Sequence, residues 1–507
     1  MKKLASGYRL IFGYLGVFLI VVGIICLLPL FMLIGYPDEA NHAINFIIPG
    51  CSSLGIGIAL MFLIVGREKA QLGKHQDSVL LVMIWVTAIL ICAVPFAMSK
   101  IQLGEAGMNI TESVFESTSG FATVGLTRLP ENMFDYKIYL FFRILLQFFG
   151  GIGLVLVVTS AISDRYGLKL YTAEGHNDKL MPNLAKSARL ILGIYFLYIL
   201  LGTIAYIIAG VDWFDAINHS VCAVSTGGFS SRPGGLTEIL SGMPEGNAIA
   251  VEVITCTLMV LGGINFLIHL FLITGRWRKV ARDCEIRLFA SIIIIFVPLF
   301  FLSVWMSGIT DNVGLAFRYG AFTFFSNITT TGFSNIGNLN LLGQGVLFMV
   351  VVLNIVGCGM GSTAGGIKQY RLAIACKAFY WNVKERLANK NYIFPNFIWR
   401  TGEKREVTKN DSLEAFGYIG LYIIVLFLGG FLVTIFGMQG GLDYGTALFE
   451  FSNALSGTGL TNGLTSYANS AILWVLIVGM FAGRLEIMAI HFAFMRGFRD
   501  LFKKETI

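Results

Sequence analysis

Long apolar stretches, separated by short polar segments, recur along the whole chain. A membrane-spanning helix needs roughly 20 consecutive apolar residues, and this pattern predicts ten spans. They cover residues 8–36, 44–66, 77–99, 136–162, 186–210, 247–274, 287–308, 342–376, 413–437 and 470–495. The first stretch is long and lacks a small-residue cleavage site, so we expect a retained span rather than a signal peptide.

Composition and charge place the chain in a bilayer. Hydrophobic residues make up 56% of the 507 residues and charged residues only 13%, whereas soluble domains carry about 25% charged residues. Basic residues gather on one side of the predicted spans, which favours a cytoplasmic position for both termini. This bias and anionic lipid account for the net charge of +7 without a nucleic-acid partner. The basic segments are 2–9, 67–74, 165–189, 276–287, 377–409 and 496–504.

Four short loops between apolar stretches end alike. Each is a run of Thr, Ser and Gly that closes on a glycine, followed by a bulky apolar residue and then Ser or Thr. They lie at 121–127, 223–230, 329–334 and 455–461. Matching segments about a hundred residues apart indicate four copies of one part. Because non-helical backbone in a membrane must line a cavity or be buried in protein, we expect the loops to close around one axis on the outer side. Such a ring of carbonyls is a dehydrating site for a cation.

The repeated unit is a span, a half-length helix, a loop and a second span. About ten half-apolar residues precede each loop, and helices of this kind direct partial negative charge at the membrane interior. We therefore predict an all-α polytopic membrane protein with four span–pore-loop–span repeats around a central pore, plus two extra N-terminal spans. The predicted boundaries are 1–76 for the extra pair and 77–163, 164–275, 276–378 and 379–507 for the repeats.

The closing glycine of each loop has a conformational reason. A strand that turns successive carbonyls toward one axis alternates backbone handedness, and the positive-φ position is cheap only for glycine. The matching positions are Gly125, Gly228, Gly332 and Gly459. The Thr and Ser residues before them supply hydroxyls at the inner end.

The second span of each unit carries a glycine-rich break, and the third copy is the most extreme. It holds Gly357, Gly359, Gly361, Gly365 and Gly366 in the middle of an apolar stretch. Each glycine costs about 1 kcal/mol in a helix relative to Ala, so we predict an unwound loop over 357–366 that acts as a mobile barrier. A plain helix kink at a tight contact is the alternative.

Three charged residues stand out in the apolar stretches. Arg484 lies inside the last span, where a charge costs about 2.5–3.5 kcal/mol on insertion scales. It could face the pore as a barrier to cations, pair with carbonyls of the glycine loop, or pair with Glu486. Glu116 and Glu450 occupy the same offset in the first and fourth copies. They either support the loops through hydrogen bonds to backbone or are simple polar residues near the outer mouth.

These motifs carry a resemblance to a known family. The TTTGFS loop at 329–334, the STGGFS loop at 225–230, the break at 357–366 and the Gly-Arg-Leu-Glu run at 483–486 resemble the membrane subunit of bacterial Trk/Ktr potassium uptake systems. That superfamily includes the plant HKT transporters. The resemblance covers residues 77–507, and the leading span pair makes the chain more similar to the TrkH branch than to KtrB.

The resemblance implies a four-loop potassium filter in one subunit of the cell inner membrane. It also implies a homodimer above a cytoplasmic ring of nucleotide-binding, TrkA-like regulatory subunits. The implied ion contacts add two residues before each closing glycine: Thr123 and Val124, Thr226 and Gly227, Thr330 and Thr331, and Gly457 and Thr458. The implied gating elements are the loop 357–366 and Arg484. Potassium is the substrate, and no cofactor is expected.

Two loops depart from the family pattern. The first has Ala-Thr-Val at 122–124 where Thr-rich sequence is usual, and the fourth has Ser-Gly-Thr at 456–458. Both keep the closing glycine. In plant relatives a Ser at the first closing position goes with sodium transport, so Gly125 implies potassium.

Two functions from different classes compete. The first is a potassium-selective pore or symporter, and both passive flux and flux coupled to sodium or protons fit. The alternative is a broken-helix secondary transporter of another cation (sodium) or a small solute, with unwound helices in paired halves. The repeat here is fourfold and parallel, which favours an ion. A membrane enzyme is not expected, because the sequence shows no catalytic constellation.

Overall fold

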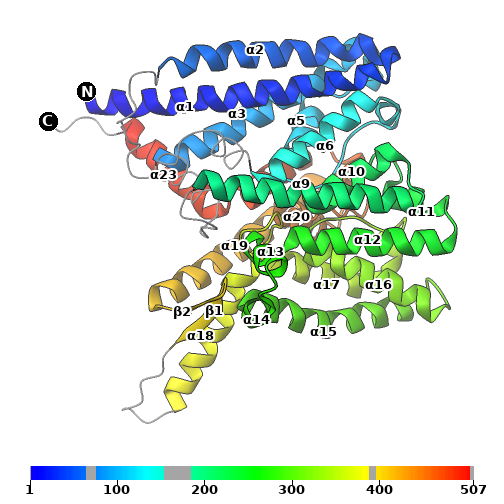
Figure 1. Ribbon diagram of the computed structural model, residues 1–507, viewed down its shortest axis with the longest axis vertical. Helices are drawn as coiled ribbons and strands as arrows, with labels where there is room; N and C mark the ends of the chain where they lie inside the picture. The colour runs from blue at the N-terminus through cyan, green and yellow to red at the C-terminus, as the bar shows by residue number, and fades with distance from the viewer. Residues whose placement is uncertain (1, 64–75, 154–183, 388–395, 503–507) are drawn as a thin grey trace.

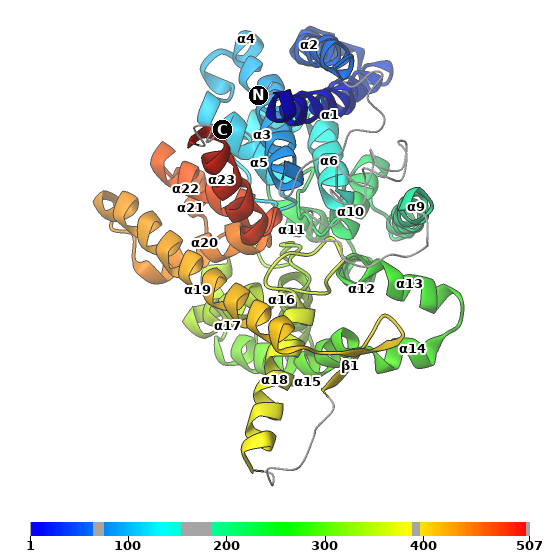
Figure 2. The same cartoon turned by 90° about the vertical axis from the view of Figure 1, so that its left-hand side faces the viewer.

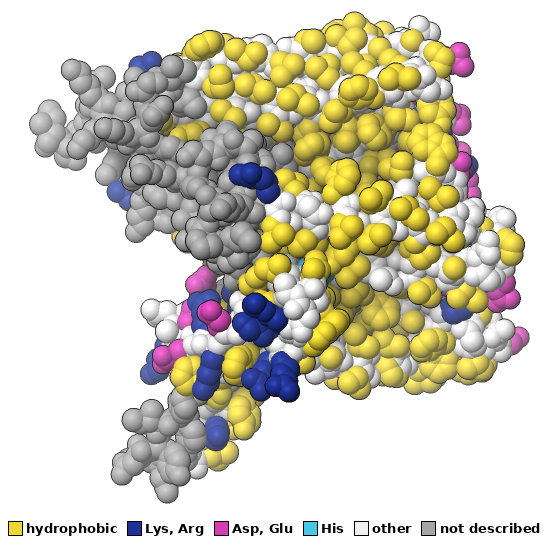
Figure 3. Space-filling view, in the orientation of Figure 1, with side chains coloured by type: hydrophobic (Ala, Val, Ile, Leu, Met, Phe, Trp, Pro, Cys, Tyr) yellow, Lys and Arg dark blue, Asp and Glu magenta, His cyan; other side chains and the backbone are white. Residues whose placement is uncertain are grey.

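In the computed structural model, residues 2–63, 76–153, 184–387 and 396–502 are described. Helices make up almost all of this part of the chain. Eight helices are long and apolar enough to cross a membrane, and a further bent pair passes the same test as one unit. Hydrophobic side chains cover a broad band between the two ends of the molecule (Figure 3). The chain is therefore a polytopic membrane protein built from helices, as predicted.

The N-terminal pair of spans lies at one edge of the molecule (Figures 1 and 2). It packs against itself and against the first span of the first unit. Its elements are α1 (Lys2–Leu27), η1 (Leu28–Ile34), η2 (Pro37–His42) and α2 (Ala43–Met61), and the neighbour is α3 (Gln76–Met98).

Four units follow, each with a half-length helix between longer ones. The first holds α3, α4 (Lys100–Leu103), η3 (Gly104–Ala106), α5 (Ile110–Phe121), η4 (Glu131–Asp135) and α6 (Lys137–Ile152). The second holds α9 (Leu184–Ile208), α10 (Trp213–Val224), α11 (Gly235–Ser241), α12 (Glu245–Gly263), α13 (Phe266–Ile273) and α14 (Trp277–Arg282). The third holds α15 (Cys284–Met306), α16 (Val313–Ile328), η5 (Leu339–Leu342), α17 (Gly343–Val356) and α18 (Gln369–Leu387). The fourth holds β1 (Phe397–Arg400), β2 (Glu403–Glu406), α19 (Lys409–Gly437), η6 (Met438–Gly440), α20 (Tyr444–Ser456), α21 (Leu464–Tyr467), α22 (Ser470–Arg484) and α23 (Ile487–Phe502).

The four units close into a ring. The half-length helices α5, α10, α16 and α20 each contact the long helices of their own unit. Between units, α6 contacts α10, α12 contacts α16, α17 contacts α20, and α22 contacts α5, so the fourth unit meets the first. Figure 2 looks along this arrangement and shows the helices grouped around a common centre.

Each half-length helix begins at an Asn or Asp side chain. Asn109, Asp212, Asn312 and Asp443 are the N-caps of α5, α10, α16 and α20, and each accepts a hydrogen bond from a backbone N–H of the first turn. Such caps satisfy donors that the helix cannot use itself. The starts of the four half-length helices are thus fixed by the same local feature, a capping Asn or Asp side chain.

The predicted spans 247–274, 342–376 and 470–495 are interrupted at the glycine-rich breaks that the sequence shows. The helix α12 ends at Gly263 before α13, and α17 ends where Gly357 adopts a φ of 65°. The helices α22 and α23 are bent by 100°. Glycines and positive-φ residues interrupt the helical hydrogen-bond ladder at these points. In the first unit α6 ends at Ile152, and residues 154–162 of the predicted span 136–162 lie outside the described residues.

Candidate functional site

The four closing glycines lie in one closed ring. A Cβ built on Gly125 would lie 2.5 Å from the backbone oxygen of Gly227 in the second loop. The relationship continues around the ring in order: a Cβ on Gly228 would clash with the oxygen of Thr331, one on Gly332 with the oxygen of Thr458, and one on Gly459 with the oxygen of Val124. The structure therefore brings all four predicted loops together, with a backbone oxygen of each facing the glycine of a neighbour.

Backbone handedness alternates in every loop. Positive φ occurs at Gly125 (93°), Gly228 (71°), Gly332 (86°) and Gly459 (73°). It also occurs two residues earlier, at Thr123 (52°), Thr226 (51°), Thr330 (54°) and Gly457 (78°). The residues between, such as Val124 and Thr331, are not among the positive-φ positions. Alternation of this kind turns successive peptide groups in the way the sequence predicted for a carbonyl-lined strand.

The first of these positive-φ positions also ends the half-length helix. The amide of Thr123 donates to the oxygen of Gly120 (3.1 Å), and the amide of Val124 donates to the oxygen of Ser119 (2.9 Å). The second and third loops repeat this pair of bonds, which is a Schellman helix end. Glycine usually occupies the left-handed position of that motif, and the fourth loop has Gly457 there. Threonine in the other three loops is a strained choice, because positive φ is an outlier for a β-branched residue.

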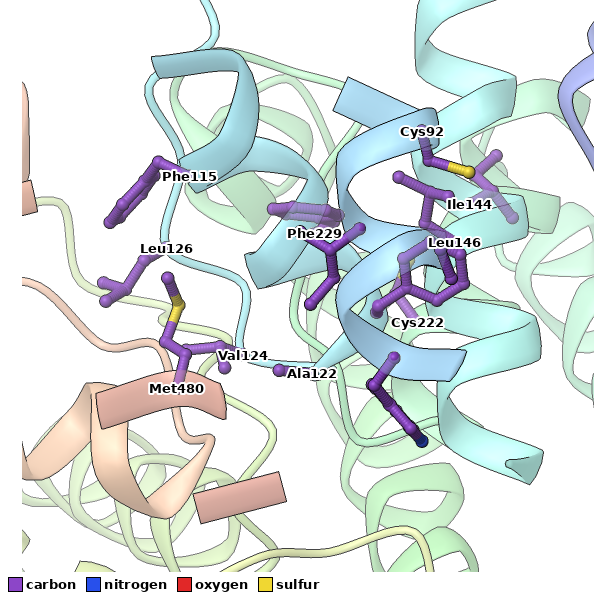
Figure 4. Close-up of a cluster of buried hydrophobic side chains, with 14 of the residues drawn as sticks. Cys92, Phe115, Ala122, Val124, Leu126, Ile144, Leu146, Cys222, Phe229 and Met480 are labelled. Carbon is purple, nitrogen blue, oxygen red and sulfur yellow. The ribbon is translucent and has the colours of Figure 1, made fainter. Parts of the chain in front are cut away.

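The apolar side chains of the first loop point into the protein core. Val124 and Leu126 are buried in a cluster that includes Phe115 and Met480 (Figure 4). The burial of these two side chains anchors the first loop in the surrounding protein. The backbone is thus held from behind by packing, which leaves its polar groups for the centre.

A glutamine that the sequence analysis did not single out holds the second loop. Gln147 on α6 is fully buried, donates to the oxygen of Gly227 (2.5 Å) and accepts from the amide of Phe229 (3.3 Å). A Cβ on Gly227 would clash with this side chain. The amide of Gln147 therefore fills the place that a side chain occupies at the equivalent position of the other loops. Nothing in the local pattern around residue 147 marks this contact.

The outer side of the ring is fastened by a repeated hydrogen bond. In the first, second and fourth loops, the residue nine positions before the closing glycine bonds to the Ser or Thr two positions after it. Thr127 donates to Glu116 (3.0 Å), Thr461 donates to Glu450 (2.5 Å), and Ser230 lies 3.2 Å from the imidazole of His219. Both glutamates also accept a backbone N–H, from Arg128 and Asn462 (2.9 Å each). Of the two alternatives for Glu116 and Glu450, the geometry favours support of the loops.

The first glutamate has a cationic partner. Arg143 on α6 pairs with Glu116 at 2.8 Å, and the two side chains are 2% and 0% exposed. Arg143 also donates to the oxygen of Ser230 (2.9 Å) and stacks on the ring of Phe229 at 4.0 Å. This buried pair ties the first loop to the second.

The glycine-rich break between α17 and α18 forms a buried loop beneath the ring, near the centre of Figure 2. Three hydrogen bonds join this loop to the break between α12 and α13. The amide of Gly359 donates to the oxygen of Gly263 (3.0 Å), and the amide of Phe266 donates to the oxygen of Gly361 (3.3 Å). The side chain of Asn265 donates to the oxygen of Met360 (2.6 Å). At its ends, Gly357 and Gly366 have positive φ and lie against each other. Glu285 on α15 accepts the amide of Met360 (3.0 Å). The predicted unwinding over 357–366 is present.

Arg484 reaches from the end of α22 into the same region. It donates to the oxygens of Thr363 (3.0 Å), Gly151 (3.1 Å) and Gly150, and lies 3.4 Å from the hydroxyl of Thr123. The guanidinium binds a carbonyl of the glycine loop, which was one of the alternatives, and it also lines the cavity below the ring. Its role as a barrier to cations stays a prediction. Glu486 pairs with Arg371 at 2.6 Å.

A small cavity of about 40 Å³ lies at the inner face of the ring. Thr123 and Gly457 line it from the loops, and Arg484, Glu486 and Lys368 line it from below. Lys368 has a φ of 78° and donates to the oxygen of Ala364. The sequence analysis missed this residue, although a Lys that directly follows a glycine-rich break in an apolar stretch was a visible signal. Two basic side chains and one carboxylate therefore line the lower side of this cavity.

Comparison with known proteins identifies the family. The family model described as TrkH, cation transport protein, matches residues 45–498. The chain belongs to this family. It is 28% identical to an uncharacterized cation transporter of Methanocaldococcus jannaschii over 94% of this chain and 93% of that protein. It is 27% identical to the Trk system potassium uptake protein TrkH of Salmonella typhimurium over 95% of this chain and 97% of that protein.

A solved structure of the TrkH family has the same fold. The crystal structure of the potassium transporter TrkH from Vibrio parahaemolyticus superposes with a TM-score of 0.81 at 23% identity, over 96% of this chain and 98% of that one. The family resemblance read from the loops is thus confirmed. The roles of the individual loop residues as ion ligands stay a prediction.

Proposed function

We propose that this protein takes up potassium ions across the cytoplasmic membrane through the ring of four loops. One observation carries the proposal: four loops from one chain form a closed ring in which the carbonyl-bearing positions alternate in handedness. A ring of backbone oxygens replaces the hydration shell of a cation. The proposed ligands are the three residues that end at each closing glycine. Relatives that are named for potassium uptake support potassium as the ion.

The loop 357–366 and Arg484 are the proposed gate. Like charges about 4 Å apart repel by about 4 kcal/mol at an effective dielectric constant of about 20. A membrane potential of 100 mV supplies about 2.3 kcal/mol per charge. For a cation held at Thr123, the repulsion from Arg484 exceeds the driving force of the membrane potential, so inward flux requires the guanidinium or the loop to move.

The charge distribution supports an orientation with the gate on the cytoplasmic side. Most Lys and Arg side chains visible in Figure 3 gather at the end that carries α14, α18 and the β1–β2 hairpin, where some Asp and Glu lie among them, and the opposite edge carries mainly Asp and Glu. Positive residues favour the cytoplasmic side. The basic end is the proposed contact for a cytoplasmic regulatory ring, and a homodimer is the proposed assembly.

The alternative of a broken-helix transporter for a small organic solute is less well supported. Helix breaks occur in the second, third and fourth units around one centre rather than in paired halves. The cavity at the ring holds about 40 Å³, whereas sites for organic ligands measure about 300–1,000 Å³. A sodium pore remains an outcome of the test below.

Ion flux in liposomes tests the proposal. The purified protein is reconstituted, and uptake of potassium, rubidium and sodium is measured with and without a sodium or pH gradient. We expect potassium and rubidium to enter in preference to sodium under a negative internal potential. Equal entry of sodium, or uptake of no monovalent cation, would overturn the proposal. Dependence on the imposed gradient separates coupled from passive flux.

A further inference from the structure

The inner end of the ring is covered by the gate loop and Arg484. The hydroxyl of Thr226 donates to the hydroxyl of Thr363 (3.0 Å). The amide of Gly365 donates to the hydroxyl of Thr330 (2.7 Å). The guanidinium of Arg484 lies 3.4 Å from the hydroxyl of Thr123. The hydroxyl of each of these three threonines therefore contacts the loop 357–366 or Arg484, which lie below the ring.

The fourth loop is covered in a different way. Gly457 has no hydroxyl, and here the backbone of Gly365 lies directly against the oxygen of Ser456, which leaves no room for a Cβ. The segment 363–365 thus touches the second, third and fourth loops, and Arg484 touches the first. Each of the four loops therefore contacts either the segment 363–365 or Arg484.

The strain at the three threonines points to a use for their hydroxyls. Gly457 demonstrates that a residue without a side chain fits the same helix end, and glycine adopts positive φ at little cost. A β-branched residue there is held only by surrounding structure. The hydroxyl oxygens are the polar groups that threonine adds, and each contacts the loop 357–366 or Arg484.

Each of these three oxygens already has a partner below the ring. A hydroxyl has one proton and two acceptor lone pairs. The amide of Gly365 directs a hydrogen at the oxygen of Thr330, and the guanidinium directs positive charge at that of Thr123. A cation bound to these oxygens from below would occupy the same space and meet like charge.

We propose that the hydroxyls of Thr123, Thr226 and Thr330 form an innermost cation site that the closed gate loop and Arg484 occupy in place of the ion. Loop closure and cation binding at this level then compete, so that permeant ion itself favours release of the loop. The inference rests on the proposed function, because it requires the ring to bind a cation.

Hydrogen exchange of the unmodified protein in lipid nanodiscs tests this competition. Exchange of the backbone amides in peptides covering 357–368 is followed as potassium replaces choline at constant ionic strength, with sodium as the second replacement. We expect potassium to speed exchange of these amides by about threefold or more, since opening exposes them. Peptides from α2, which lies at the edge of the molecule, serve as the internal control and should be unaffected.

Two substitutions at one position sharpen the test. Thr330→Val removes the oxygen and keeps the shape, so exchange of the loop should be fast without potassium and should respond little to it. Thr330→Ser keeps the oxygen and should behave like the parent. Thr87→Val, which removes an ordinary helix-internal hydroxyl on α3, is the remote control and should also behave like the parent.

The outcomes separate this inference from the proposed function. Selective potassium flux together with loop exchange that potassium leaves unchanged or slows would overturn the competition alone. Equal acceleration by sodium would also overturn it, because the site would not belong to a selective ring. Absence of selective flux would overturn the proposed function.

Discussion

The side-chain amide of Gln147, in the first unit, donates a hydrogen bond to the backbone oxygen of Gly227, in the second. The bond crosses the boundary between two units and ends on a residue of the ring itself. We predict that Gln147→Leu will weaken discrimination between potassium and sodium, because the second loop loses its lateral support. Loss of the buried donor should also lower the free energy of unfolding by about 1–3 kcal/mol.

Competition between the two ions in the flux assay checks the Gln147 prediction. Gln102→Leu is the matched control, since Gln102 bonds to Asn45 and Asn41 at the edge of the molecule, away from the ring. Selectivity of the Gln147 variant equal to that of the parent would argue against a role of this residue in shaping the ring.

Gly332→Ser should abolish or strongly reduce selective flux. The added Cβ would clash with the oxygen of Thr458, and the backbone has a φ of 86° that L side chains rarely adopt. Rubidium uptake by reconstituted protein measures the effect. Gly337→Ser is the control, because a Cβ at Gly337 meets open space. Equal loss in both variants would point to general damage rather than to the ring.

Glu116→Gln should destabilise the protein strongly. It leaves the guanidinium of Arg143 buried without its counter-charge, and breaking a buried pair costs about 3–5 kcal/mol. Unfolding by denaturant in detergent gives the change in free energy. Glu245→Gln breaks an exposed contact to Arg318, in which Glu245 is 82% exposed, and should cost at most about 1 kcal/mol. Similar costs for the two variants would contradict the structural role of the Glu116–Arg143 pair.

Arg484→Gln should raise basal flux in the absence of any cytoplasmic partner. The substitution keeps polar contacts to carbonyls and removes the positive charge from the cavity. We expect an increase of at least about tenfold, which corresponds to about 1.4 kcal/mol of barrier. Arg484→Lys keeps the charge and should remain close to the parent. A glutamine variant with unchanged flux would remove Arg484 from the barrier.

The sequence predicted the parts of the site that recur. Gly125, Gly228, Gly332 and Gly459 could be aligned because each copy repeats the same local chemistry, and local chemistry sets backbone conformation. The four N-caps that start the half-length helices follow the same logic, and the sequence analysis overlooked them although Asn109 and its equivalents were visible.

Contacts between distant parts could not be predicted in the same way. The bond from Gln147 to Gly227 joins residues 80 positions apart, and the pair Arg371–Glu486 joins residues 115 positions apart. No periodicity encodes such pairs, since only the closed ring brings them together. At 342–376 hydropathy alone runs on through the stretch, and the glycines of 357–366 are the local signal that marked the break there.

The mismatch among the three threonines and Gly457 has a wider consequence. A channel assembled from identical subunits changes all four sides of its opening with every substitution. Here the four loops are separate segments of one chain, so a substitution in one loop changes a quarter of the ring and leaves the other three loops unchanged. Conductance and ion preference can therefore be adjusted in small steps, and an intermediate variant need not be a broken one.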